Sequence, residues 1–303
     1  MGVRRARTAG EGQRRQPLDR ARGGVRVSAL VRAAPVATSA KIGRTAAACL
    51  KLEIATYPKP GLVSPVDSGA HDDMDAALMD RSADALAPFL TALAEAGAAG
   101  AGMDRLRAIG IAAEAAMMAA TGGINTHRGA IFGMGLLCAA AGFRARYAVP
   151  QTLGAIVAHR WGAEILRGPV ALHSHGSTVA RRHATGGARA EAAAGFPSLY
   201  RIALPALIEG RCLAAGEEAR RVHALMALIV GVADTNLLYR GGAEGLAFAQ
   251  AEARAFLAAG SVAAANWRPR AIAIHAAFTA RRLSPGGCAD LLAMALFAEA
   301  LAA

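Results

Sequence analysis

Apolar residues recur along most of this chain at the spacing of amphipathic helices. Between Met79 and Leu93 apolar side chains are three or four positions apart, which places them on one face of a helix. The same spacing follows the acidic pair Glu217-Glu218, whose carboxylates suit the positive end of a helix dipole. No segment alternates clearly between apolar and polar residues, so the pattern predicts an all-α fold. Similar apolar runs predict further helices at about 40–55, 103–120, 129–143, 152–167, 198–214, 243–259, 267–280 and 287–302.

The predicted helices form a single-domain multi-helix bundle that covers residues 37–303. They show no fixed-period repeat, and no Pro- or Ser-rich linker divides them. Pro205 is expected to kink its helix, and Ser284 is a candidate N-cap for the last one. If the polar segments between helices gather at one end of the bundle, they form one pocket. These segments are 56–75, 121–129, 173–191, 234–242 and 283–290.

Composition agrees with close-packed helices and confines the positive charge to one end. Hydrophobic residues make up 54% of the chain and aromatic residues 5%, as in a core of Ala, Leu, Met and Val. The net charge is +12, but eleven basic and only two acidic residues lie in residues 1–44, which leaves +3 for the rest. We interpret residues 1–36 as a disordered basic extension rather than a transit peptide or a nucleic-acid arm. The body is not expected to bind nucleic acid.

Neither a membrane span nor a disulfide framework is indicated. The longest apolar run, near Ala130–Phe143, is interrupted by glycines and is shorter than the roughly 18–20 residues that a membrane helix needs. The four cysteines are far apart, lie in apolar contexts and form no CxxC pair. They are typical of reduced core residues, so we expect a cytoplasmic protein with no membrane partner.

Four Gly-Gly pairs provide the main indication of a functional site. They are Gly122-Gly123, Gly186-Gly187, Gly241-Gly242 and Gly286-Gly287, and each lies near Asp, Asn, Arg or Glu. A single pair usually ends a helix, whereas four pairs beside polar residues favour one shared polar site. The first pair is the most informative, because an Asn, a His and an Arg follow it at the start of the next helix. There they are suited to contact an anion or a nucleotide.

Other polar segments add cations and carboxylates. Lys59 lies between two prolines, which we expect to hold it out as a point charge. The carboxylates between Asp67 and Asp75 suit Mg²⁺, although Asp73 or Asp75 is also a candidate helix N-cap. His175 is interpreted as a hydrogen-bonding residue rather than a zinc ligand. There is no P-loop, no GxGxxG and no GxSxG, so basic residues beside glycine loops suggest an enzyme acting on a nucleotide.

These segments, in this order, resemble the triphosphoribosyl-dephospho-CoA synthase family. The likeness covers roughly residues 40–303, and it departs from the family pattern at Ser174 and Ala190. The matching pieces are 58–63, 69–74, 123–129, 175–176, 187–191 with 195–197, 234–236 and 283–290.

The resemblance implies that ATP and 3′-dephospho-CoA react to give 2′-(5″-triphosphoribosyl)-3′-dephospho-CoA and adenine, with Mg²⁺ accompanying ATP. The product would be the prosthetic-group precursor for the acyl-carrier subunit of malonate decarboxylase or citrate lyase, attached by a downstream transferase. The Ala- and Arg-rich composition favours malonate decarboxylase. The alternatives are another Mg²⁺-dependent enzyme that cleaves a nucleotide N-glycosidic bond, or a non-catalytic module that binds a nucleotide or a carrier protein.

The resemblance also assigns expected roles to residues. His71, Asp73 and Asp234 are the candidates for the base that activates the attacking hydroxyl and the acid that protonates adenine, without a choice among them. Asp73, Glu191 and Asp234 are the candidate metal ligands. The candidate substrate-binding residues are Lys59, Gly123, Asn125, His127, Arg128, His175, Arg189, Asn236 and Arg240.

Overall fold

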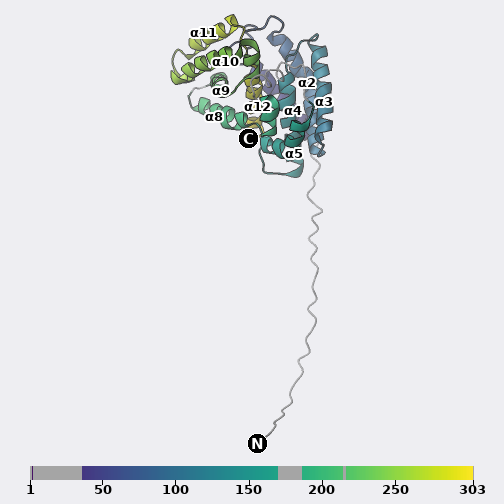
Figure 1. The fold of residues 1–303 in the computed structure, drawn as a ribbon. Coiled ribbons are helices and arrows are strands. Elements are labelled where there is room, and N and C mark those ends of the chain that lie inside the picture. Colours follow the sequence, from purple (N-terminus) through teal and green to yellow (C-terminus); the bar gives the residue numbers. More distant parts are fainter. Residues whose placement is uncertain (1, 3–35, 170–185, 214–215, 303) are drawn as a thin grey trace. The chain divides into compact units, whose positions relative to one another are not determined.

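The computed structural model describes residues 2, 36–169, 186–213 and 216–302 of the chain. Within these ranges every regular element is helical, which confirms the predicted all-α fold (Figure 1). The described helices belong to one compact unit. They are α1 (Val36–Ile54), α2 (Ala76–Ala98), α3 (Met103–Ala120), α4 (Arg128–Tyr147), α5 (Leu153–Arg167), α7 (Gly187–Ala193), the π-helical η1 (Leu199–Ala203), α8 (Leu204–Leu213), α9 (Glu217–Gly231), α10 (Thr235–Ala258), the 3-10 turn η2 (Ser261–Ala263), α11 (Trp267–Ala280) and α12 (Gly286–Ala300).

Helices α1 to α4 pack against one another through apolar faces and glycines. The predicted face of α2 is buried at Ala83, Leu86, Leu90 and Leu93. Where α2 meets α4, a Cβ on Gly97 would overlap the Ala139 carbonyl, and a Cβ on Gly142 would overlap that of Ala94. These glycines let the two backbones approach closely, so α4 lies deep in the fold and its N-terminal end is held beside the start of α2.

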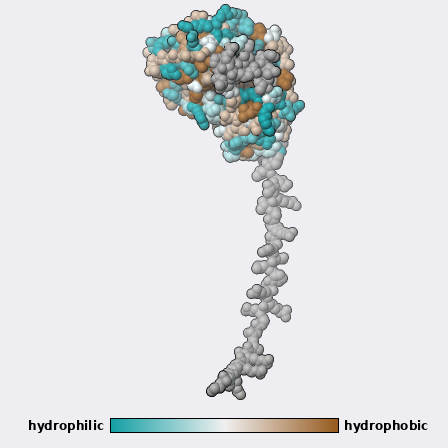
Figure 2. Space-filling model, in the orientation of Figure 1, coloured by the Kyte–Doolittle hydropathy of each residue, from teal (hydrophilic) through white to brown (hydrophobic). Residues whose placement is uncertain are grey.

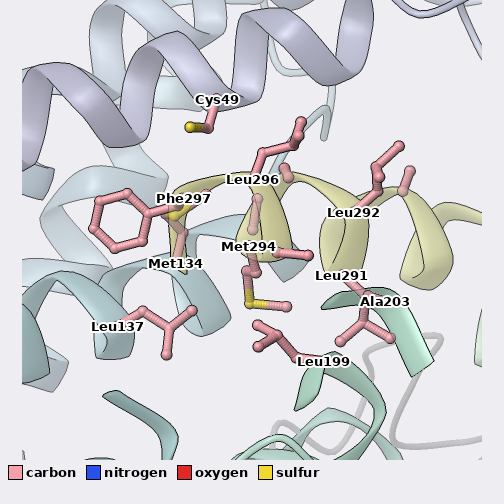
Figure 3. Close-up of a cluster of buried hydrophobic side chains, with 14 of the residues drawn as sticks. Cys49, Met134, Leu137, Leu199, Ala203, Leu291, Leu292, Met294, Leu296 and Phe297 are labelled. Atoms are coloured by element: carbon pink, nitrogen blue, oxygen red, sulfur yellow. The ribbon is translucent and has the colours of Figure 1, made fainter. Parts of the chain in front are cut away.

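Helix α12 is the central element of the core. Nearly all of its side chains are buried, and it packs against α1, α4, α9 and η1. Figure 3 shows Leu296 and Phe297 of α12 among Cys49 of α1, Met134 of α4 and Leu199 of η1. A helix that is apolar all round is stable only when other elements surround it. The position of α12 therefore joins the α1–α4 half of the bundle to the α8–α10 half.

A π-helical turn precedes Pro205, where the sequence predicted a kink. Leu204 N donates to Leu199 O, five residues back, in the turn that immediately precedes Pro205. Proline lacks the N–H that a regular α-helix would use there, and a widened turn accommodates the missing hydrogen bond.

Four of the five predicted inter-helix loops are partly helical. Residues 187–193 form α7, and α10 begins at Thr235 rather than after Gly241-Gly242, with non-helical dihedrals at Gly242 (φ 63°, ψ −160°). At α10 the prediction failed because Asp234 caps the helix before the Gly-Gly pair is reached, whereas α7 begins at Gly187 within its own pair. Ser284 is likewise not the N-cap of α12, which begins after Pro285. The alternative at the start of α2 is settled, because Asp75 caps it by accepting from Leu78 N.

The described surface is mixed in character. Figure 2 shows hydrophilic residues over much of one face, interrupted by small apolar areas. Of the cysteines, Cys49, Cys138 and Cys288 are buried free thiols as expected, but Cys212 is exposed. No single described helix is long and apolar enough to cross a membrane. The bent pair formed by α9 and α10 meets the length and composition test, with 61° between the two helices.

Candidate functional site

The segment that follows α1 contains a buried ion pair. Lys59 Nζ donates to Glu53 Oε1 at 2.6 Å and to the Glu53 carbonyl at 2.8 Å, and the lysine is only 1% exposed. Burial lowers the pKa of Lys59, the Glu53 carboxylate opposes that shift, and Arg221 adds to it. The expectation that the prolines hold Lys59 out as an exposed charge is therefore wrong. An ammonium has three hydrogens, so one remains for a further acceptor, and substrate binding by Lys59 stays a prediction.

A second cluster links the segment before α2 to the start of α12. His71 Nε2 lies 3.0 Å from Ser284 Oγ, and Arg240 Nη2 lies 3.3 Å from His71 Nδ1. Because Arg can only donate, Nδ1 is the acceptor and the neutral ring carries its hydrogen on Nε2. Burial, followed by the Arg240 charge, lowers the pKa of His71. This tautomer donates to Ser284, so in this geometry His71 does not act as a base toward it.

Arg240 and Asp73 both approach Nδ1 of His71 but have different roles. Arg240 Nη1 donates to the carbonyls of Ala70 and Arg282, which fixes the loop before α2 against the loop before α12. Asp73 Oδ1 is 3.7 Å from His71 Nδ1, too far for a hydrogen bond. Its side chain is 61% exposed, so it remains open to a ligand from solution.

Asp234 holds the first turns of two helices together. Oδ1 accepts from Asn236 N and Leu237 N at the start of α10, and Oδ2 accepts from Cys288 N of α12 at 2.8 Å. The side chain is buried, which raises its pKa, while the three backbone N–H groups oppose that shift. All three of these contacts are with backbone N–H groups, so the predicted catalytic and metal roles of Asp234 have to compete with its capping role.

The polar stretch before α4 is divided between surface and interior. Gly122 and Gly123 have positive φ and open surroundings, and Asn125 Oδ1 accepts from Arg128 N. The Arg128 guanidinium pairs with Glu114 of α3 at the surface. These residues are exposed or partly exposed and therefore accessible to a substrate.

His127 lies in the interior and ends a chain of hydrogen bonds. Thr126 Oγ1 donates to Ser82 Oγ at 2.7 Å, and Ser82 Oγ lies 2.8 Å from His127 Nδ1. Because the Ser82 hydroxyl hydrogen has His127 Nδ1 as its acceptor, the ring hydrogen is placed on Nε2. That nitrogen is buried and has no hydrogen-bond partner within the described residues. Burial, aided by the Lys59 charge, lowers the pKa of His127 to about 4.

This shift makes the stability of the fold depend on pH. An unfolded His has a pKa of about 6.5, so between pH 6.5 and about 4 the unfolded chain binds a proton that folded His127 does not. The free energy of unfolding should be fully retained above pH 6.5 and fall by up to about 3 kcal/mol as the pH drops through this window. Chemical denaturation at several pH values should show that His127→Gln reduces this slope. Replacing His159, which is exposed on α5, should leave it unchanged. If the free energy of unfolding changed with pH in the same way in wild type and in His127→Gln, the pH dependence would not come from His127.

Arg189 and Glu191 lie on α7, where both have structural partners. Arg189 donates through Nε and Nη2 to carbonyls at the C-terminal end of α5, those of Ile165, Leu166 and Gly168. Glu191 Oε1 accepts from Ser198 N at 2.7 Å. Arg189 Nη1 has no partner among the described residues, so its predicted contact with a triphosphate stays a prediction. His175 lies outside the described residues.

Three glycines mark the place where the starts of α4, α10 and α12 meet. A Cβ on Gly129 would collide with Asp290 Oδ2, and one on Gly286 would press on Asn236 Nδ2. At Gly287 an added Cβ would lie 3.0 Å from Asp234 Oδ2. Only glycine allows polar side chains to approach the backbone this closely. Asn236 is thus brought beside α12, next to Asp234.

Several polar residues of this region were not predicted as site residues. In the sequence, Asp290 is marked only by being the first acidic residue after Gly286-Gly287, and Glu53 only by lying six residues before Lys59. His275 of α11 had no sequence signal, yet its ring bridges the Lys59 carbonyl and Asp67, with Nε2 3.0 Å from Asp67 Oδ1. Arg221 of α9 donates through Nε to Thr56 Oγ1 at 2.7 Å. Contacts between segments far apart in sequence create these positions.

Comparison with known proteins gives a consistent result. A family described as ATP:dephospho-CoA triphosphoribosyl transferase matches residues 39–303. A probable 2-(5''-triphosphoribosyl)-3'-dephosphocoenzyme-A synthase of Stutzerimonas stutzeri (strain A1501) is 39% identical over 283 residues, which cover 91% of this chain and 96% of the relative. The Klebsiella pneumoniae 2-(5''-triphosphoribosyl)-3'-dephosphocoenzyme-A synthase is 40% identical over 269 residues, or 86% and 94% of the two chains.

A probable synthase of the same name from Pseudomonas aeruginosa (strain UCBPP-PA14) is 43% identical over 254 residues, which cover 81% of this chain and 85% of the relative. A search of the solved structures found none that matches. The matched region contains every described helix from α2 onward and most of α1. The chain therefore belongs to the ATP:dephospho-CoA triphosphoribosyl transferase family and is an enzyme of the transferase class.

Proposed function

We propose that the chain transfers the triphosphoribosyl group of ATP to the 2′-hydroxyl of 3′-dephospho-CoA and releases adenine. The observation that carries the proposal is the meeting of the α4, α10 and α12 starts around Asp234 and Asp290, with Glu53 and Lys59 nearby. N-terminal ends of helices favour anions, which suits a triphosphate. Carboxyl groups suit the proton transfers that replacement of an N-glycosidic bond requires.

The reaction breaks one bond and forms another at C1′ of the ATP ribose. The bond from C1′ to adenine N9 breaks, its electron pair passes into the purine, and the 2′-oxygen of dephospho-CoA takes the vacated position. No P–O bond changes, so the triphosphate is a binding handle. Two groups are proposed to contact it: Arg128, which is exposed beside Gly129, and Nη1 of Arg189, which has no partner among the described residues. Arginine is well suited to phosphate, because its planar fork of donors matches the oxygens.

Mg²⁺ is proposed to arrive as the complex with ATP. The described residues do not bring three His, Cys, Asp or Glu side chains together as a metal site. Asp234 is occupied by three N–H groups and Glu191 by Ser198 N, so neither is free as the structure stands. Asp73 is the candidate ligand that remains exposed. This donor set does not fit a metal held by all three carboxylates, and no step is assigned to it.

One experiment tests the proposed reaction. Purified protein is incubated with ATP, Mg²⁺ and 3′-dephospho-CoA, each is omitted in turn, and adenine is followed by chromatography. We expect adenine only in the complete mixture, in equal amount to the new dephospho-CoA derivative. Adenine formed without dephospho-CoA would favour a nucleosidase that uses water. If no mixture yields adenine, the chain is a binding module and the proposal fails.

We further propose that the product is made in the cytoplasm and serves the acyl-carrier subunit of malonate decarboxylase, through a downstream transferase. The support is the Ala- and Arg-rich composition, which is typical of a GC-rich genome, and it favours this target over citrate lyase. A strain that lacks the chain should lose growth on malonate. Normal growth on malonate combined with loss of citrate fermentation would assign the product to citrate lyase instead.

A further inference from the structure

We propose that Asp290 is a catalytic residue that donates the proton to the leaving adenine. This inference rests on the proposed function and adds a residue to it. Asp290 lies in the first turns of α12, and its Oδ2 lies so close to Gly129 of α4 that no side chain fits there. Gly129 is exposed and Asp290 is partly exposed. The carboxyl group therefore lies between the starts of α4 and α12, next to the accessible backbone of Gly129.

Asp290 differs from the neighbouring acids in having no partner. Glu53 receives the Lys59 ammonium, and Asp234 receives three backbone N–H groups. Asp290 forms neither a hydrogen bond nor an ion pair with any described residue. A carboxylate is stable in a protein interior only when cations or N–H donors compensate its charge. The negative charges of this region are therefore held on Glu53 and Asp234, while Asp290 retains its proton.

The ionisable groups that interact with Asp290 are Glu53 at the end of α1, Asp234 before α10 and the thiol of Cys288 on α12 itself. Further ionisable groups of the adjoining segments are Lys59, which is paired with Glu53, and His127, two residues before Gly129. Burial raises the pKa of Asp290 well above its ordinary value, and the carboxylates of Glu53 and Asp234 raise it further. The cation of this segment, Lys59, is paired with Glu53 rather than with Asp290.

His127 gives independent evidence that a ligand enters this region. It stands two residues before Gly129, and its charge-sensitive ring responds to Lys59. Its Nδ1 faces Ser82 of α2, so Nε2 faces the other way, where its hydrogen has no acceptor among the described residues. A buried donor of this kind costs about 1–3 kcal/mol unless a partner arrives. The ring nitrogens of a purine base are acceptors of the type that both His127 and a protonated Asp290 require.

The proposed step balances as follows. The C1′–N9 bond breaks with its electron pair moving into the purine, and the Asp290 proton moves to a ring nitrogen, so that neutral adenine leaves. The attacking 2′-hydroxyl of dephospho-CoA forms the new O–C1′ bond and gives its proton to solvent or a second carboxylate. Asp290, left as a carboxylate, regains a proton from solvent before the next turnover.

Two substitutions test the role of Asp290 against a matched control. Asp290→Asn keeps the shape of the side chain, and it removes no charge because the protonated carboxyl group is already neutral. The melting temperature should therefore be nearly unchanged. The rate of adenine formation should fall at least about 100-fold, the scale of a general acid, and the high-pH limb of the rate profile should disappear. Gly129→Ala should push the carboxyl aside and also lower kcat. Gly133→Ala is the control, because it displaces Met294 one turn further along the same two helices.

The identity of the leaving base provides a second test, because a purely structural role of Asp290 would not depend on the ring nitrogens of that base. Wild type should react more slowly with either 7-deaza-ATP or 3-deaza-ATP than with ATP, by about the factor by which Asp290→Asn lowers the rate with ATP. The rate of Asp290→Asn should not fall any further when ATP is replaced by that analogue. Asp290→Asn with wild-type kcat would overturn the proposal while leaving the proposed function intact. Full recovery of this variant at high Mg²⁺ would make Asp290 a metal ligand and also overturn it. A wild type that releases no adenine would refute the proposed function itself.

Discussion

Lys59→Met should lower the free energy of unfolding by about 3–5 kcal/mol, because it leaves the Glu53 carboxylate buried without a counter-charge. The two side chains are 1% and 6% exposed, and their contact is 2.6 Å. Removing one member of such a pair costs more than the pair itself contributes, since a lone buried charge has no water to compensate it. Urea denaturation followed by circular dichroism measures the difference.

Lys51→Met is the matched control. Lys51 lies one turn before Ile54 on α1, the helix that also carries Glu53. Lys51 pairs with Asp84 at 2.7 Å, but both side chains are well exposed. Exposed pairs contribute about 0–1 kcal/mol, so this variant should be close to wild type. The double variant Lys59→Met/Glu53→Leu should recover most of the lost stability, because it removes both charges. If Lys59→Met is as stable as Lys51→Met, the buried pair does not form in solution.

Asp234→Ala should lower the free energy of unfolding by about 2–5 kcal/mol, because this one side chain accepts hydrogen bonds from the first turns of two helices. Loss of the α10 N-cap removes about 0.5–2 kcal/mol, and the buried Cys288 N–H loses its acceptor at a further cost of about 1–3 kcal/mol. Asp75→Ala is the comparison, since Asp75 caps α2 alone and is exposed. It should cost about 1 kcal/mol.

Hydrogen exchange locates the Asp234 effect. In Asp234→Ala, protection should decrease in the first turns of both α10 and α12, although these helices are about 50 residues apart in sequence. In Asp75→Ala it should decrease only at the start of α2. Exchange that changes at α10 but not at α12 would show that the contact with Cys288 is not made.

The helix pattern was predictable because apolar spacing reports directly on local structure. The ranges predicted for 103–120 and 267–280 coincide with α3 and α11, and the buried face of α2 was correct from Ala83 onward. The start of α10 was misplaced, because Gly241-Gly242 suggested a loop while Asp234 had already capped a helix. A Gly-Gly pair marks a break in a helix but does not fix the residue at which the helix begins.

The candidate site was only partly predictable, for a different reason. Sequence patterns indicated which polar residues are present, but the partner of each side chain depends on contacts across the fold. Lys59 was expected to face solvent and instead pairs with Glu53. Asp290 became distinctive only when the structure showed that its neighbours have partners, whereas it has none among the described residues. No local pattern reports that difference.

The central position of α12 has a consequence for synthesis of the chain on the ribosome. This helix spans Gly286–Ala300, so it is translated after every other described helix, yet it fills the space between α1, α4 and α9. The earlier helices must wait with the apolar faces that α12 will cover still exposed to water, a state prone to aggregation. Nascent chains arrested before Gly286 should therefore recruit chaperones, and the bundle should close only after α12 has emerged from the ribosome.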